Sequence, residues 1–269
     1  MRKLILFVLS AVCLNAQWLN YPDPRTPRTK EGKPNLTAPA PRANGKPDLS
    51  GLWEADVTPR SELDAVLGAA FFDLQVDVPR LNKYVVNLLW DFKPADDPSR
   101  PETLALLKQR SNETIPGSHC LPNSIPITPL LLPFKIVQTP QQMVMIFEHY
   151  DPPRQIYTDG RSMPKSLDPS WAGYSIGKWQ GDTMIVESTG FNGKTWLDAA
   201  GHPRGASAHL TERYRRPDFG HLSIDFTVDD PQNYKRPFTV KLPFHLIPDS
   251  DVLEAVCTEN EKDEAHVRN

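Results

Sequence analysis

Side chains that could carry out acid–base chemistry gather between residues 196 and 204 of this 269-residue chain. Asp198 and His202 stand four residues apart in this stretch, and His209 follows shortly after it. A carboxylate can orient a nearby imidazole so that the ring acts as a general base. The pattern therefore predicts a catalytic group of His202, Asp198 and His209. The alternative is a polar loop that Trp196 anchors and that has no catalytic role.

A second group of side chains could hold an anionic ligand. Two arginines, Arg154 and Arg161, flank Tyr157 and Asp159 at the end of a short predicted strand, and guanidinium groups pair well with anions. On a later strand, Arg213 shares a face with His209 by the two-residue period. The predicted ligand-binding residues are Arg154, Tyr157, Asp159, Arg161, Trp196 and Arg213. Solvated arginines on outer faces and at a hairpin corner are the alternative.

The usual signatures of enzymes and cofactor sites are missing. The sequence has no GxSxG, HExxH, GxxxxGK[ST], CxxC or GxGxxG motif. The formal net charge of −3 argues against a nucleic-acid surface driven by bulk positive charge. Histidines and carboxylates are present, but no spacing fixes them on one face, so we predict neither a metal site nor a cofactor.

The first residues and the cysteines indicate the compartment. Residues 1–16, MRKLILFVLSAVCLNA, have a short basic start, an apolar centre and a small residue at the end. This is the pattern of a secretory signal peptide, and it is too short to span a bilayer. We expect a periplasmic or secreted protein. Cleavage would leave Cys120 and Cys257, an even pair that predicts a disulfide in an oxidising compartment. Two separate buried thiols are the alternative.

Proline marks the boundaries of the elements that must position these residues. Seven of the 28 prolines lie in residues 17–48, which predicts an extended proline-rich arm. Residues 49–260 are predicted to form a single β-rich domain with a helical insertion at 60–115, and residues 261–269 a charged tail. Strands are predicted at 134–138, 142–150, 154–158, 173–179, 183–189, 207–215, 221–229, 238–242 and 252–257. We expect a mainly β, antiparallel barrel or sandwich.

Gly51-Leu52-Trp53 opens the predicted domain and favours a lipocalin-like barrel, in which a Gly-x-Trp closes the barrel floor. An ordinary core tryptophan is the alternative. Further blocks, YTDGR, GKWQGDT, LTERYRRPDFGHL and CTENEKD, resemble a family of secreted, functionally uncharacterised proteins of environmental bacteria. The resemblance implies export and one domain, but no activity. Our leading hypothesis is an exported barrel that binds a small apolar or anionic ligand. A hydrolase or lyase using a His/Asp pair and an envelope interaction protein without a small-molecule site are the alternatives.

Overall fold

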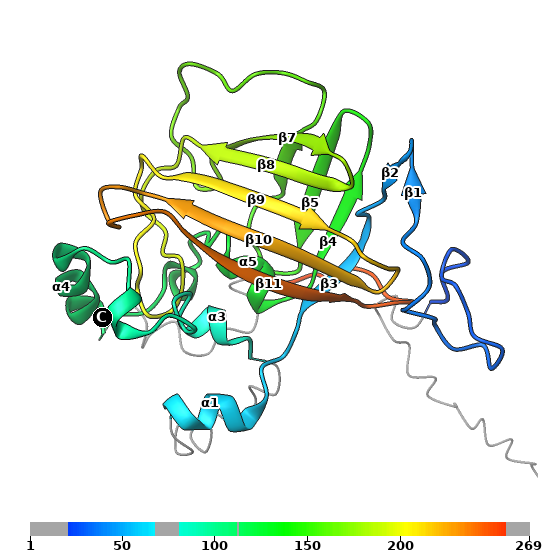
Figure 1. The fold of residues 1–269 in the computed structure, drawn as a ribbon, viewed down its shortest axis with the longest axis horizontal. Helices are drawn as coiled ribbons and strands as arrows, with labels where there is room; N and C mark the ends of the chain where they lie inside the picture. The colour runs from blue at the N-terminus through cyan, green and yellow to red at the C-terminus, as the bar shows by residue number, and fades with distance from the viewer. Residues whose placement is uncertain (1–20, 68–80, 112, 257–269) are drawn as a thin grey trace, which may run out of the picture.

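The computed structural model describes residues 21–67, 81–111 and 113–256, and its main feature is a closed β-barrel (Figure 1). Nine strands follow one another around the barrel in chain order, and the last of them pairs with the first. They are β3 (Gly51–Ala55), β4 (Phe134–Gln138), β5 (Gln142–Phe147), β6 (Arg154–Tyr157), β7 (Tyr174–Gln180), β8 (Thr183–Thr189), β9 (His209–Arg215), β10 (His221–Asp229) and β11 (Phe238–Leu246). The predicted mainly β barrel is confirmed. One pair, β6 with β7, is parallel.

Alternation along the strands decides which side chains fill the barrel. In β10, Ile224 and Phe226 are buried, whereas His221 and Asp229 are exposed. Ile224 lies opposite Tyr214 of β9, which is also buried, because facing residues in a ladder share one side of the sheet. The other strands contribute large buried side chains to the same core: Trp53, Phe134, Met143, Met145, Phe147, Phe238 and Phe244. The interior is therefore packed with side chains.

Two strand predictions near the C-terminal end are wrong. Strand β11 runs on through Pro243 to Leu246 and does not stop at Leu242. The carbonyl of Pro243 accepts from the amide of Asp56, one residue past the end of β3, so the nitrogen of the proline faces a position where strand β3 has already ended. Residues 252–256 form no strand. Once β11 pairs with β3, the barrel has no free edge that a further strand could join.

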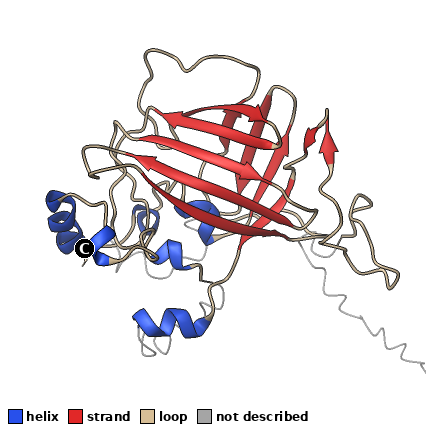
Figure 2. Ribbon diagram, in the orientation of Figure 1, coloured by secondary structure: helices blue, strands red, loops and turns tan. Residues whose placement is uncertain are grey.

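Helices occupy the region of the predicted insertion and lie to one side of the barrel (Figure 2). They are α1 (Arg60–Leu67), α3 (Lys83–Val86), η1 (Pro94–Asp96) and α4 (Pro101–Arg110), and they are followed by η2 (Pro116–His119) and α5 (Ile127–Leu131). Helix α4 begins at Pro101, where the missing N–H has no helical partner to lose. Helix α3 contacts α5, and α5 contacts β3. Leu88, just after α3, is fully buried in the barrel core.

The described part of the arm, residues 21–48, is tied to the barrel by polar contacts. It contains a small ladder of β1 (Arg42–Ala43) with β2 (Lys46–Pro47). The amide of Gly220 donates to the carbonyl of Leu36 at 2.7 Å, and Arg42 forms an ion pair with Asp182 at the turn after β7. The arm predicted as an extended segment thus lies along the turns at one end of the barrel (Figure 1).

Several predictions concern residues outside the described part of the chain. The signal peptide at 1–16, the charged tail at 261–269 and Cys257 all lie there, and so does the predicted bond between Cys257 and Cys120. Within the described ranges, no helix combines the length and the apolar character that a bilayer span requires.

Trp53 lies where the two ends of the barrel sheet meet. Its side chain is fully buried, and its indole N–H donates to the carbonyl of Leu49 at 3.0 Å. The guanidinium of Arg216 lies 4.9 Å from the ring centroid. A Cβ on Gly51 would lie 2.5 Å from a methyl carbon of Leu246, so glycine fits this close approach. Trp53 is therefore a core residue at the closure point of the barrel, a position that fits an ordinary core tryptophan as well as the predicted plug.

Replacing Trp53 should weaken the whole barrel. We expect Trp53→Ala to lower the free energy of unfolding by about 3–5 kcal/mol, because it removes a fully buried aromatic ring at the closure point. Urea denaturation measures this change. Tyr21→Ala, at a side chain that is 67% exposed, is the control and should shift the free energy by no more than about 0.5 kcal/mol. Equal effects of the two substitutions would contradict the plug role.

Candidate functional site

The structure brings together two of the three predicted catalytic residues. Nδ1 of His202 lies 2.6 Å from Oδ2 of Asp198, and both side chains are buried. That same oxygen accepts from the amide of Leu88 at 2.6 Å, and Oδ1 accepts from the amide of His202. Both oxygens of the carboxylate thus accept hydrogen bonds within the protein, and the bond from Leu88 attaches the loop 195–204 to the segment after α3. His209 is exposed on the outer face of β9, opposite Asp229, and does not join the pair.

Trp196 also helps to attach this loop to the neighbouring helices. Its ring is buried, and the guanidinium of Arg110 in α4 lies 4.7 Å from the ring centroid. Arg110 also donates to the carbonyl of Gly201 at 2.6 Å. The loop that carries the predicted acid–base pair is therefore held to the helices on both sides. This is the arrangement of a structural anchor.

The other predicted ligand residues lie on different surfaces. Arg161 extends over the ring of Tyr157, with its guanidinium 3.8 Å from the centroid, and forms an ion pair with Asp159. Arg161 and Asp159 are exposed. Arg213 lies on the outer face of β9, opposite Asp225 of β10. Arg154 alone points into the barrel, so these six residues do not form one site.

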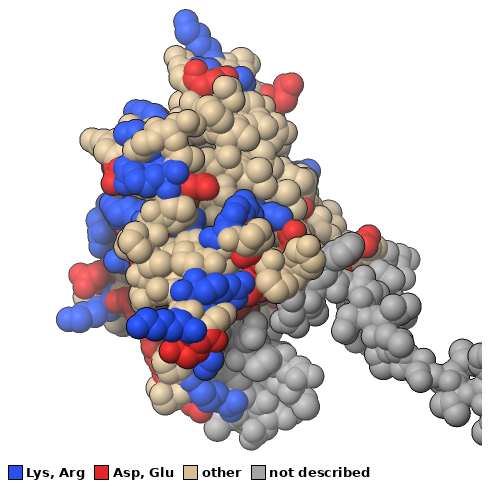
Figure 3. Space-filling view, turned by 90° about the vertical axis from the view of Figure 1, so that its right-hand side faces the viewer, with Lys and Arg blue, Asp and Glu red and all other residues tan. Residues whose placement is uncertain are grey.

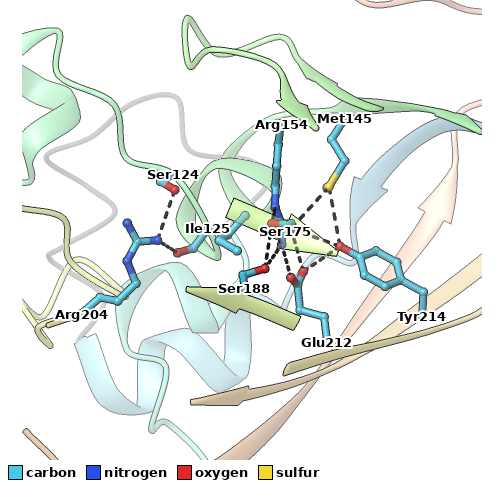
Figure 4. Close-up of polar contacts among 9 residues, drawn as sticks. All are labelled: Ser124, Ile125, Met145, Arg154, Ser175, Ser188, Arg204, Glu212 and Tyr214. Carbon is cyan, nitrogen blue, oxygen red and sulfur yellow. Dashed lines mark hydrogen bonds and ion pairs between the residues drawn. The ribbon is translucent and has the colours of Figure 1, made fainter. Parts of the chain in front are cut away.

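Arg154 is the centre of a buried polar network (Figure 4). It forms a two-pronged ion pair with Glu212 of β9, and it donates to Ser188 Oγ of β8 at 2.9 Å and to Ser175 Oγ of β7. The hydroxyl of Tyr214 donates to Glu212 at 2.7 Å. The network joins the four neighbouring strands β6, β7, β8 and β9. It adds side-chain contacts between β6 and β7, whose ladder has only two paired positions.

The charges of this network compensate one another. Burial is the largest single influence and would lower the pKa of Arg154, but the charges and hydrogen bonds of Glu212 and Tyr214 together outweigh it and raise the pKa. Burial, together with the charge of Glu212, raises the pKa of Tyr214 well above its usual value. Arg154 is therefore held as a cation by a partner inside the protein. A pair with this geometry positions strands and leaves no free charge for a ligand.

A second buried arginine, Arg204, lies near this network without a carboxylate partner among the described residues (Figure 4). It donates to Ser124 Oγ, to the carbonyl of Ile125 and to the carbonyl of Trp171, the last at 2.7 Å. Burial, with a smaller contribution from the positive charge of Arg154, lowers the pKa of Arg204 to about 9. The recess beside these residues measures only about 10 Å³, which is room for roughly one water molecule.

Residues near this recess resemble a Ser/His/Asp group that sequence reasoning did not find. Asp151 accepts from Nδ1 of His149 and from the amide of Ser124. The hydroxyl of Ser124 accepts from Arg204, and the far ring nitrogen of His149 faces Asn123 at 3.5 Å. A nucleophile needs a base within hydrogen-bond reach. None of the hydrogen bonds of His149 reaches the hydroxyl of Ser124, so we assign the group to the folding of this loop.

One large hollow lies at the end of the barrel where Trp53 and the arm meet. We call it the floor groove, and its volume is about 550 Å³. Its walls are the arm, β3, β4 and the segment after β11. The lining residues are Asp23, Arg25, Thr26, Pro41, Asp48, Ser50, Gly51, Leu52, Lys135, Ile136, Val137, Gln138, Arg216, Phe219 and residues 246–251. Ligand pockets usually measure 300–1,000 Å³, so the groove has the size of a small-molecule site.

Charged side chains of both signs surround the floor groove. Asp23 pairs with Arg25 at 2.8 Å, and Lys135 pairs with Asp251 at 2.7 Å. Figure 3 turns the right-hand side of Figure 1, where the arm lies, toward the viewer, and shows Lys and Arg interleaved with Asp and Glu there. The apolar part of the lining includes Leu52, and also Val137, whose side chain is 39% exposed. The lining of the groove thus combines apolar and charged side chains.

No protein-family model matches the chain, and neither a curated protein nor a solved structure matches it. Among the residues that the structure describes, no group of three or more His, Cys, Asp or Glu side chains could hold a metal ion. None of the predicted site residues lines the floor groove. Sequence patterns could not reveal the groove, because its walls come from both ends of the described chain.

Removing one partner of the buried ion pair should be costly. We expect Glu212→Gln to lower the free energy of unfolding by about 3–5 kcal/mol, because Arg154 is then a buried charge without compensation. Urea denaturation at pH 7 tests this. The control is Asp182→Asn, which breaks the exposed pair with Arg42 and should leave the urea midpoint nearly unchanged. A Glu212→Gln protein as stable as the control would overturn this account.

The attachment of the arm beside the floor groove should weaken in acid. The hydrogen bond from Arg28 lowers the pKa of Asp249, whose Oδ1 also accepts from the amide of Asp23 at 3.0 Å. A lowered pKa means that this attachment is at full strength above the unfolded carboxyl pKa of about 3.9 and is lost as the pH falls through the lower folded value. We expect the amide NMR signal of Asp23 to shift in that window.

The variant Asp249→Ala provides the control for this titration. It removes the acceptor, so the part of the Asp23 shift that Asp249 causes should be absent, while the contribution of the carboxyl of Asp23 itself remains. A titration of the Asp23 signal that is the same in Asp249→Ala and in the original protein would assign the shift to another carboxyl.

Proposed function

We propose that this protein is an exported binding protein that takes a small, mostly apolar molecule in the floor groove. The observation that carries the proposal is the groove itself, with a volume of about 550 Å³ and a lining that combines apolar residues of β3 and β4 with polar side chains. This composition is typical of sites for small molecules, in which a few polar groups orient a largely apolar ligand. The signal-peptide pattern of residues 1–16 supports export.

The packing of the barrel supports a site at the floor and not one in the interior. Phe134, Phe147, Phe226 and Phe244 all belong to the buried core of the barrel. Arg154, the one predicted ligand residue that points inward, is already paired with Glu212. A ligand in the interior would have to displace this core, whereas the groove offers space that is already formed.

The arrangement of the acid–base groups favours binding over catalysis. Asp198 accepts three hydrogen bonds from its own surroundings, and neither it nor His202 lines the floor groove. A general base has to reach the proton that it removes. The pair of Asp198 and His202 attaches a loop to the neighbouring backbone, so we do not assign a hydrolase or lyase activity to it.

Fluorescence titration with N-phenyl-1-naphthylamine, an uncharged apolar probe, tests the proposal. We expect saturable binding to the purified protein. Val137→Asp should weaken this binding by about tenfold or more, because it replaces apolar contact with the uncharged probe by a carboxylate that would have to lose its water. The direct readout is the dissociation constant of the probe.

The matched control is Ile146→Asp. Ile146 is 36% exposed on the neighbouring strand β5, and Val137 is 39% exposed on β4, but only Val137 lines the groove. Binding by Ile146→Asp should equal that of the original protein. Binding that is not saturable, or that both substitutions weaken equally, would refute a ligand site in the floor groove.

A further inference from the structure

Arg216 is a buried cation in the wall of the floor groove. Its side chain extends between the rings of Trp53 and Phe219, with its guanidinium 4.9 and 5.2 Å from their centroids. The residue is only 5% exposed, yet it contributes to the lining. Its place at the junction of β9 and the following turn fixes it against the barrel floor.

All hydrogen bonds of Arg216 go to neutral acceptors. Nη1 donates to the carbonyls of Asp48 and Ser50, Nη2 to the carbonyl of Phe219, and Nε to the carbonyl of Asp218. A guanidinium has five N–H groups, so these four bonds leave one N–H of Nη2 without an acceptor among the described residues. No carboxylate in the described ranges forms an ion pair with this arginine.

The other charges around the groove are mostly committed to one another. Asp23 pairs with Arg25, Asp251 with Lys135, and Asp249 with Arg28 from just outside the lining. Asp48, which is half-buried, accepts from the amide of Ser50 at 2.9 Å and attracts Arg216 from a distance. Arg216 is therefore the one lining cation whose direct partners are all uncharged.

Burial makes this cation costly in the empty groove. It lowers the pKa of Arg216 to about 10, against the opposing attraction of Asp48 and Asp218. An anionic group placed beside the guanidinium would offset this cost, because charge-assisted hydrogen bonds are stronger than neutral ones.

From this geometry we infer that the ligand of the floor groove carries one anionic group, such as a carboxylate or sulfonate, which binds the free N–H of Arg216 while its apolar body covers Leu52 and Val137. The inference rests on the proposed function and adds the charge of the ligand to it. The ligand would then be bound through apolar contacts and through one buried cation, Arg216, which would set the orientation of the ligand.

Two probes that differ by a single group test the inference. The compound 8-anilinonaphthalene-1-sulfonate has the rings of N-phenyl-1-naphthylamine plus one sulfonate. We expect the sulfonate probe to bind with a dissociation constant about tenfold lower, as one charge-assisted hydrogen bond implies. If the uncharged probe binds equally well or better, the inference fails and the proposed function stands. If neither probe binds saturably, the proposed function itself fails.

A variant that should gain affinity separates the inference from damage to the fold. In Asp48→Asn the side-chain oxygen can still accept from Ser50, but the negative charge near Arg216 is gone. The preference for the sulfonate over the uncharged probe should rise about threefold, as expected for a partly screened charge. The control Asp229→Asn makes the same change in net charge on the outer face of β10 and should leave the preference unaltered. An unchanged or reduced preference in Asp48→Asn, or the same rise in both variants, would overturn the inference.

Discussion

Closure of the barrel depends on a five-residue strand. Strand β3 pairs with β11 on one side and with β4 on the other, and each ladder includes Trp53. The short strand holds because its tryptophan is fully buried, bonded to the carbonyl of Leu49 and covered by Arg216. The same arginine fastens the carbonyls that precede β3. Barrel closure and the wall of the floor groove are therefore products of one set of contacts.

The three buried arginines are stabilised in different ways, and two of them keep a donor group without an acceptor among the described residues. Arg154 is neutralised by Glu212, whereas Arg204 and Arg216 rely on carbonyls, a hydroxyl and aromatic rings. Burying a charge is costly unless it is paired and hydrogen-bonded. The two arginines with neutral partners consequently have lowered pKa values, and only Arg216 of the two lines a hollow of ligand size.

Sequence patterns predicted the buried face of a strand but not the contacts that depend on several strands. The alternation over 221–229 identified the buried face of β10 correctly, because a two-residue period translates directly into a side of the sheet. It could not pair Arg154 with Glu212, since that contact depends on the register of four strands. A strand was predicted at 252–257, but residues 252–256 form none because the closed barrel has no free edge, and β11 continues beyond the predicted end at Leu242 to Leu246.

The contact between Asp23 and Asp249 joins segments that are 226 positions apart in the chain. The walls of the floor groove are drawn from residues on both sides of this separation, so the groove does not exist until β3 and β11 have met. Partly folded chains would lack it altogether. Anything that binds there stabilises only the completed barrel and shifts the folding equilibrium toward it. A ligand of the groove would thus bind only to fully folded molecules, and bound ligand would report that folding is complete.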